Sequence, residues 1–304
     1  MNDILSLSNQ YCLIDQQTFN EVLNTQGLFF ENICHIDKNK ITNDLLNPIK
    51  AEKQAEILET YCDLRKKKVL EIGSGLGVNH IVWTKKYDID GYGIEPSEEG
   101  FSSSHNISKR LIVDNNLDPL RIIDAVGEAL PFPDNSFDIV YSTNVLEHTS
   151  NPEQVIREGF RVLKNQGIMQ FVYPNYHSYM DGHYAVFHPP ILFRAFFPWY
   201  VKTIFGRDPS FAKTLRTELN IPWTQSVLNN LRANHDLEVL TLGEEVFTAR
   251  MYTLNFEPWA GLQKVANILN IFNNLKINRI LASLILFLNG HNPIILTVRK
   301  TSER

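Results

Sequence analysis

A stretch rich in histidine and tyrosine follows a hydrophobic run in the second half of the chain. Residues 173–190, YPNYHSYMDGHYAVFHPP, contain three histidines, four tyrosines and one acid. Histidine can accept a proton near neutral pH, and a neighbouring carboxylate can orient its ring. Asp181 precedes His183 by two residues, so His183 is a candidate base. Tyr184 and His188 are candidate substrate contacts, although all of these side chains could instead pack a turn.

A metal site in this stretch is the alternative. Asp181, His183 and His188 could together hold a divalent ion, but their spacing matches no known tight ligand set, and the site expected here contains no metal. The chain has three cysteines, which form no C-x-x-C pair. Disulfides and a cysteine zinc site are therefore not expected, and a reducing cytoplasm fits the composition.

A glycine loop provides a second, independent signal. Residues 69–77 read VLEIGSGLG, a buried strand that ends in glycines and leads into a helix. Glycines allow a tight turn and a close approach of the backbone to a ligand. The spacing is G-x-G-x-G, whereas pyrophosphate loops use G-x-G-x-x-G. Glu95 ends the next strand about twenty residues later, where a carboxylate can accept hydrogen bonds from ribose hydroxyls.

Strand and helix patterns alternate around this loop. Strands are expected at 68–73, 90–96, 120–126, 137–144, 167–174, 237–243 and 294–300, and helices at 49–64, 77–87, 97–116 and 152–164. This alternation predicts an α/β, Rossmann-like fold with a seven-stranded, mostly parallel sheet and helices on both faces. Residues 1–60 are expected to form an N-terminal helical extension. Residues 61–304 are the main domain, with a lid of about 174–235 inserted after strand five.

The segment GEALPFPDNSFDIVYSTNVLEHT, residues 127–149, carries a family resemblance. Together with the glycine loop and Glu95, it resembles class I S-adenosylmethionine-dependent methyltransferases of the type 11 group. The resemblance extends to about residue 174 and implies S-adenosylmethionine as cofactor. It also implies these cofactor-binding residues: Glu71 near the amino group; Gly73, Ser74, Gly75 and Gly77 under the methionine moiety; Glu95 on the ribose; Pro96 and Ser97 beside the adenine; Asn144 and Val145 on the methionine side.

One position departs from the family pattern. An acid often lies two residues before E-A-L-P-F and binds the adenine amino group, but Val126 stands there. Gly127 and Glu128 are the expected replacements, with an ordinary turn as the alternative. His148, in LEHT beside the cofactor site, is a second candidate catalytic residue.

Two later segments resemble bacterial methyltransferases associated with surface-polysaccharide synthesis. They are DGHYAVFHPP (181–190) and FGRDPSFAKTLRTELN (205–220). This resemblance implies O-methylation of a small or carbohydrate-like acceptor, by in-line transfer with a histidine base. A lipid or quinone acceptor and a cofactor-binding protein without turnover are the alternatives. A dehydrogenase is disfavoured by the loop spacing.

Composition limits the partners. The 304-residue chain has a net charge of −5, which argues against a nucleic-acid partner. The N-terminus shows no signal-peptide pattern, and the apolar run 280–288 is too short to span a bilayer. Two apolar blocks, residues 193–205 and 268–288, are expected to be buried helices of the lid. Peripheral contact with a membrane is the other interpretation.

Overall fold

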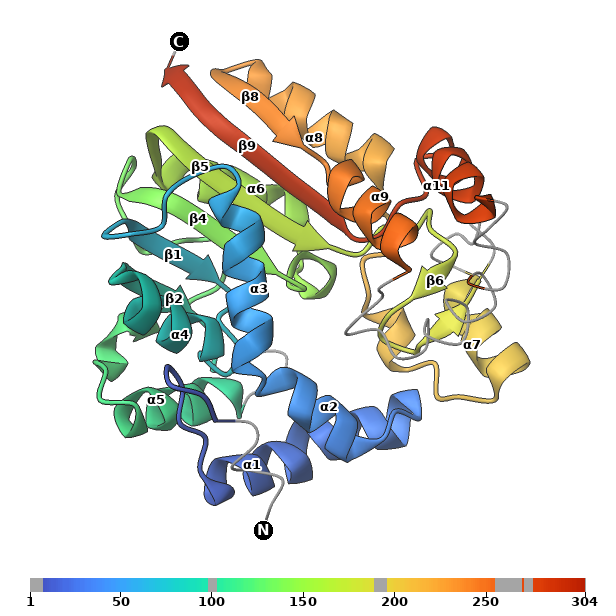
Figure 1. Cartoon of the computed structure of the whole chain (residues 1–304), viewed down its shortest axis with the longest axis horizontal. Helices are drawn as coiled ribbons and strands as arrows, with labels where there is room; N and C mark the ends of the chain where they lie inside the picture. The colour runs from blue at the N-terminus through green and yellow to red at the C-terminus, as the bar shows by residue number, and fades with distance from the viewer. Residues whose placement is uncertain (1–7, 98–102, 189–195, 255–269, 271–275, 304) are drawn as a thin grey trace.

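The computed structural model describes residues 8–97, 103–188, 196–254, 270 and 276–303. Its centre is one seven-stranded sheet (Figure 1). The strands are β1 (Lys68–Ile72), β2 (Asp90–Ile94), β3 (Ile122–Ile123), β4 (Phe137–Thr143), β5 (Leu163–Tyr173), β8 (His235–Thr241) and β9 (Ile294–Glu303). Their order is β3-β2-β1-β4-β5-β9-β8. The pairs among β1 to β5 are parallel, and β9 runs antiparallel to both of its neighbours, β5 and β8. The predicted fold class is therefore confirmed.

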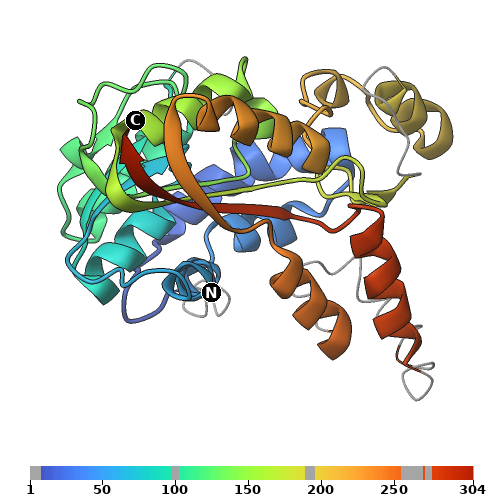
Figure 2. The same cartoon turned by 90° about the horizontal axis from the view of Figure 1, so that it is seen from above.

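Alternate residues of the strands supply two hydrophobic cores. Leu70, Val140 and Met169 face one core, whereas Val69, Ile139 and Ile168 face the other. This is the two-residue period of a strand buried on both faces. Helices α6 (Pro152–Val162) and α8 (Ile221–Arg232) cover the first face, and α3 (Pro48–Glu59), α4 (Val78–Tyr87) and α5 (Ser104–Asp114) cover the second (Figure 2).

Asparagine side chains fix where several of these helices begin. Asn47, Asn151 and Asn220 cap α3, α6 and α8 by accepting a hydrogen bond from a backbone N–H of the first turn. Each cap is followed by proline within two residues, where the missing N–H costs nothing. Each cap therefore fixes the residue at which the preceding loop ends. The loop that ends at the start of α6 carries several candidate site residues.

The N-terminal region is helical in the described part. It comprises α1 (Gln16–Val22), two π-helical turns (Leu23–Gly27 and Phe30–Cys34), α2 (Lys38–Leu45) and α3. Helix α3 is not separate from the sheet: its Ala51 and Leu58 are buried, and the Ala51 carbonyl accepts a hydrogen bond from Trp83 of α4. The N-terminal region is therefore continuous with the packing of the main domain.

The chain leaves the sheet after β5. A short hairpin, β6 (Met180–Asp181) and β7 (Val186–Phe187), precedes α7 (Phe197–Phe205) and a 3-10 turn (Phe211–Lys213). Residues 189–195 lie outside the described residues. Helix α8 then packs on the sheet through Val227, Leu228 and Leu231. The insertion proposed at 174–235 thus ends in a helix that belongs to the layer over the sheet.

A second excursion lies between β8 and β9. It contains α9 (Glu244–Thr253) and α11 (Ile277–Phe287), and these pack on the hairpin through Met180. Figure 2 shows them projecting on the opposite side from α7. Parts of both predicted apolar blocks, 193–195, 268–269 and 271–275, fall outside the described residues. The described parts are not wholly buried as expected: Trp199 and Phe287 are exposed. None of the described helices is long and apolar enough to cross a membrane.

Candidate active site

The glycine loop joins β1 to α4 in left-handed backbone conformations. Gly73, Gly75 and Gly77 have φ angles of 70°, 52° and 78°, a region that residues with a Cβ rarely adopt. A Cβ at Gly73 would lie 2.3 Å from a methyl of Val145, so this glycine is needed for packing. A Cβ at Gly75 would meet no described atom within 4 Å. Gly75 therefore borders space that a ligand can occupy.

Two carboxylates face this loop. Oε2 of Glu95 accepts a hydrogen bond from the Gly75 N–H at 2.9 Å, and burial raises the pKa of Glu95 to about 7. Glu71 lies on β1, only 5% exposed, with Oε1 bound by the Asn79 side chain at 2.7 Å. Its Oε2 has no hydrogen-bond partner among the described residues. Burial raises the pKa of Glu71 to about 8, despite the opposing hydrogen bond from Asn79.

The carboxyl end of β3, beside that of β2, carries an acid that the sequence motifs did not identify. Asp124 directly follows β3, and its carboxylate accepts hydrogen bonds from the backbone and hydroxyl of Ser97. These bonds hold the pKa of Asp124 below its usual value. Ser97 and Pro96 follow the carboxyl end of β2, so the two strand ends are tied together. Asp124 lies inside the strand predicted at 120–126, whereas β3 ends at Ile123, so an acid near the carboxyl end of a strand was the signal that could have identified it.

Gly127 and Glu128 have structural contacts. A Cβ at Gly127 would lie 3.0–3.1 Å from side-chain carbons of Val155 and Ile72, so the chain packs closely there. Oε1 of Glu128 accepts hydrogen bonds from the backbone and hydroxyl of Ser150 and from the Asn151 N–H. The carboxylate thus braces the loop before α6. These contacts favour the ordinary turn over the replacement for the adenine-binding acid.

The turn after β4 connects the glycine loop to the histidines. Asn144 adopts a left-handed conformation with φ of 55°, and Val145 packs against Gly73. A 3-10 turn, Leu146–His148, follows at once. Because β1 and β4 are adjacent parallel strands, their carboxyl ends meet at one edge. Glu147 and His148 follow Val145 directly and therefore lie close in space to the predicted cofactor loop.

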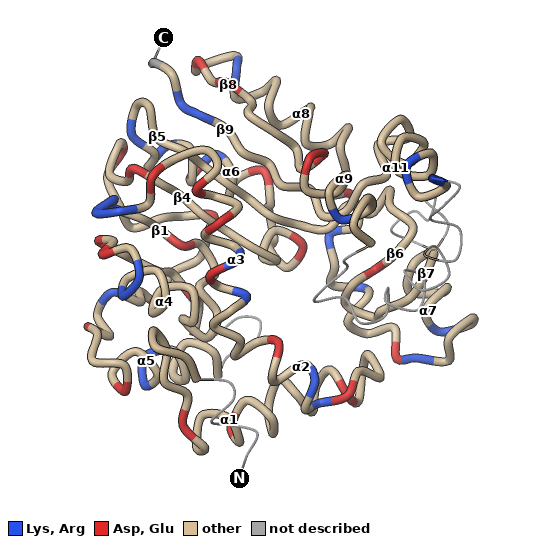
Figure 3. The backbone as a smooth tube through the Cα atoms, viewed as in Figure 1, with Lys and Arg blue, Asp and Glu red and all other residues tan. Residues whose placement is uncertain are grey.

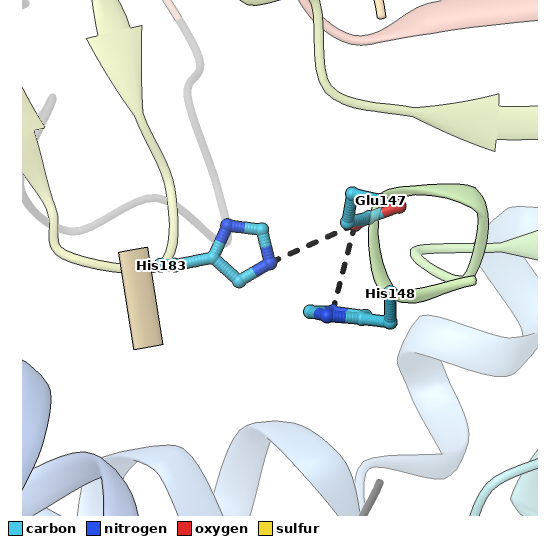
Figure 4. A group of neighbouring side chains, drawn as sticks. All are labelled: Glu147, His148 and His183. Atoms are coloured by element: carbon cyan, nitrogen blue, oxygen red, sulfur yellow. Dashed lines mark ion pairs between the residues drawn. The ribbon is translucent and has the colours of Figure 1, made fainter. Parts of the chain in front are cut away.

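His183 meets this turn from the β6–β7 hairpin (Figure 4). The rings of His148 and His183 lie 5.1 Å apart, edge to face. Oε1 of Glu147 is 3.7 Å from Nε2 of His183 and 4.0 Å from Nε2 of His148. Nδ1 of His183 lies 3.3 Å from Oδ2 of Asp181. Residues far apart in sequence thus form one cluster, and sequence reasoning missed Glu147 as a member.

The charges within the cluster are unusual because Glu147 is completely buried. Burial raises its pKa to about 7, partly offset by His183, and neither carboxylate oxygen has a hydrogen-bond partner among the described residues. Burial alone would lower the pKa of His183, but Asp181 and Glu147 outweigh it and raise that pKa. Burial and His183 lower the pKa of His148, and solvent moderates this effect because 34% of the side chain is exposed.

Aromatic side chains surround the two histidines. The Phe211 ring stacks on His148, with centroids 5.7 Å apart, and meets the edge of His183 at 5.6 Å. Phe29 of the N-terminal region contacts Phe211 in turn, at 5.1 Å. The N-terminal helices and the insertion after β5 therefore meet over the cluster. This contact between distant segments gives the histidines an apolar wall.

The other candidate substrate residues have internal contacts. The Tyr184 hydroxyl donates to the Asp208 carbonyl at 2.8 Å and accepts from the Ala212 N–H at 2.9 Å. The His188 ring is buried and lies edge-on to Phe197, at 5.8 Å. Among the described residues, the set with metal-ligand geometry is Glu147, His148 and His183. The alternative set with Asp181 and His188 is not brought together in this way.

Comparison with known protein families identifies a domain in the part of the chain that contains the glycine loop. Residues 70–171 match the methyltransferase domain. The match spans the glycine loop, Glu95, the 127–149 segment and β5, and it confirms the methyltransferase domain that these motifs predict. It covers about a third of the chain, so the two excursions and the N-terminal helices lie outside it.

Similar proteins are methyltransferases by name. The domain is 37% identical over 98 residues to ajmaline N-methyltransferase of Rauvolfia serpentina, covering 32% of each chain. It is 30% identical over 106 residues to sarcosine/dimethylglycine N-methyltransferase of Halorhodospira halochloris, covering 35% of this chain and 37% of that one. The chain thus matches only about a third of the length of these curated relatives.

A solved structure resembles more of the chain. Phosphoethanolamine N-methyltransferase 2 of Haemonchus contortus, in complex with S-adenosyl-L-methionine, aligns over 83% of this chain and 53% of its own. The TM-score is 0.51 at 16% identity, which is a similarity of fold. The similarity of fold therefore extends well beyond the segment with detectable sequence similarity.

Proposed function

We propose that this protein is an S-adenosylmethionine-dependent methyltransferase acting on a small-molecule acceptor. The observation that carries the proposal is the glycine loop inside the methyltransferase match: Gly75 borders open space, and two carboxylates face the loop. The cofactor would supply an electrophilic methyl group on a sulfonium. Glu71 suits its amino group, because a cation would pair with the buried carboxylate oxygen. Glu95 suits the ribose hydroxyls.

The acceptor side of the proposal is the histidine cluster. In-line transfer forms a bond from the acceptor atom to the methyl carbon and breaks the bond from that carbon to sulfur. A hydroxyl acceptor must also lose its proton, and His183, oriented by Asp181, is the candidate group to receive it. His148 and the ring of Phe211 would position the acceptor. Tyr184 is better described as a support for the hairpin, because its hydroxyl is already used.

We favour a hydroxyl on a small or carbohydrate-like molecule as acceptor, because the cluster supplies a proton acceptor that a neutral amine does not need. An amine is the second candidate, because two similar proteins are named N-methyltransferases. Incubation with labelled cofactor and matched sugar and amine panels separates them. Label in an acid- and base-stable ether indicates the hydroxyl, and label only in amines contradicts it.

Calorimetric titration with S-adenosylhomocysteine and then NADH tests the donor site directly. Binding of the first alone, with a micromolar dissociation constant, is expected. Binding of NADH alone would identify a dehydrogenase, and binding of neither would mean that the glycine loop is not a nucleotide site. The measurement needs no acceptor, so its outcome is independent of the histidine cluster.

Peripheral membrane contact is a further part of the proposal. Trp199 of α7 and Phe287 of α11 are exposed, and exposed basic residues, Lys202 and Arg279, lie on the same helices. Anionic lipid suits the combination of exposed aromatic and basic side chains on these helices.

Outside these two helices, acidic and basic residues are interspersed over the described chain (Figure 3). Vesicles of phosphatidylglycerol should sediment the protein. Because α7 and α11 project on opposite sides (Figure 2), Trp199→Ser and Phe287→Ser are measured singly, and release by either variant identifies the helix that contacts the lipid. Leu120→Ser, another exposed apolar position, is the control; release by that control as well would contradict the assignment.

A further inference from the structure

We propose that Glu147, His148 and His183 form a binding site for one divalent transition-metal ion of the zinc type. Each residue offers one ligand atom, and these atoms all lie within 4.8 Å of one another. Two imidazoles and one carboxylate are the protein ligands of many catalytic zinc centres. The proposal deepens the proposed function and rests on it, since it names what would activate the acceptor.

The strongest single observation is the state of Glu147. Its side chain is completely buried, and both carboxylate oxygens lack a hydrogen-bond partner among the described residues. A buried carboxylate without hydrogen bonds is costly, and buried charges in proteins are paired or coordinate metals. Oε1 faces Nε2 of both histidines (Figure 4). A cation between the three atoms would satisfy the carboxylate and both rings together.

Asp181 supplies the support that metal-binding histidines usually have. Its Oδ1 accepts the Tyr184 N–H at 2.7 Å, and its Oδ2 lies 3.3 Å from Nδ1 of His183. A proton on Nδ1 leaves Nε2 with its lone pair directed toward Glu147. This carboxylate–histidine–metal arrangement fixes ring tautomer and orientation. Asp181 is therefore a positioning residue, not a ligand.

The distances require only a small adjustment. Metal–ligand bonds of about 2.0–2.2 Å in a tetrahedral site place ligand atoms roughly 3.4 Å apart. The separations of 3.7 and 4.0 Å from Oε1 to the two Nε2 atoms are close to that value, and the ligand atoms of the two histidines lie within 4.8 Å of each other. Phe211 packs on both rings and limits how far they can turn away. Three protein ligands leave one position open, as in catalytic zinc sites.

The open position gives the ion a role beside the glycine loop. A hydroxyl bound to a metal ion becomes more acidic, so an acceptor held there would release its proton to solvent near neutral pH. His183 would then act through the ion instead of taking the acceptor's proton itself. Because a metal ion binds the deprotonated forms of these side chains, its binding would release protons.

Titration of chelator-treated protein with Zn²⁺ and with Co²⁺ tests the site without any acceptor or turnover. One ion per chain is expected, with visible Co²⁺ bands of tetrahedral intensity. Glu147→Gln, His148→Gln and His183→Gln should each weaken binding at least about tenfold, and Asp181→Asn by about 10–100-fold. His235→Gln is the matched control, because His235 begins β8 at the opposite edge of the sheet; its affinity should match the wild type.

Equal affinity in the wild type and in the Glu147 and His183 variants would overturn the proposal. Each variant is checked for S-adenosylhomocysteine binding, which reports folding and the donor site separately. If the variants do not fold, zinc X-ray absorption of the wild type decides: two imidazoles and a carboxylate support the site, and any other ligand set contradicts it. Intact donor binding without metal would refute this inference and leave the proposed methyltransferase standing.

Discussion

At the scale of the residue, Glu95 occupies the position on which the donor assignment depends. Its carboxylate lies at the end of β2 and accepts one hydrogen bond from Gly75. Ribose hydroxyls would add to that bond or replace it. Glu95→Ala should weaken S-adenosylhomocysteine binding by about 1–3 kcal/mol, because two hydroxyls lose a charged partner. Calorimetric titration measures this change.

Glu56→Ala is the comparison, because Glu56 is an exposed acid on α3. It changes the net charge by the same amount and should leave the affinity unchanged. An unaltered affinity in Glu95→Ala would move the ribose away from the end of β2. A loss of thermal stability in Glu95→Ala without ligand would instead indicate a structural role at the loop.

At the scale of the element, Arg216 ties the insertion after β5 to the turn that carries Glu147 and His148. Its guanidinium donates to the carbonyls of Thr149 and Ser150, both at 2.7 Å, and its backbone N–H donates to the Glu147 carbonyl at 2.9 Å. Lysine cannot reproduce the two-pronged contact. The segment before α8 thus holds one half of the cluster in place.

Arg216→Lys should therefore loosen this turn more than the protein as a whole. The expected cost is about 1–3 kcal/mol of local stability, with faster amide hydrogen exchange in residues 145–150 and 211–219. Arg232→Lys, an exposed arginine at the end of α8, is the matched control. Unchanged exchange in both segments would show that the guanidinium is dispensable for holding the turn.

At the scale of the whole molecule, the buried carboxyls make stability depend on pH. Glu71 and Glu147 have pKa values raised from 4.5 to about 8 and about 7. Above pH 4.5 the unfolded chain has released these protons, while the folded protein retains them until pH 7–8. The raised pKa of His183 acts in the same direction. The folded state therefore loses stability as pH rises from 6.5 to 8.

The loss should be on the order of 1 kcal/mol for each buried carboxyl over that range. Urea denaturation of ligand-free protein at pH 6.5 and 8 measures it. Glu147→Gln should flatten the dependence, because glutamine does not titrate. Glu52→Gln, on α3 and paired with Lys86, is the comparison and should keep the wild-type slope. Equal slopes in Glu147→Gln and the wild type would show that Glu147 is ionised in the fold.

The positions of the main strands along the chain and of the glycine loop could be predicted from the sequence, because both depend on local patterns. The short, mostly apolar sequence KVLEI marks β1 as a buried strand, and glycines mark the turn after it. The N-terminal 47 residues were hard to interpret, since their π-helical turns follow no 3.6-residue period. The packed helices α9 and α11 were also not anticipated as a second excursion.

The sequence by itself determined a methyltransferase-type sheet and nominated His148 and His183 separately. Only the tertiary structure brought them together, 35 residues apart, across a buried Glu147. It also revealed Asp124 beside Ser97 and assigned structural contacts to Glu128 and Tyr184. The physical reason is the range of the interactions in the sequence. Strands and turns depend on neighbouring residues, whereas burial, ion pairing and pKa values depend on segments that meet only when the chain is folded.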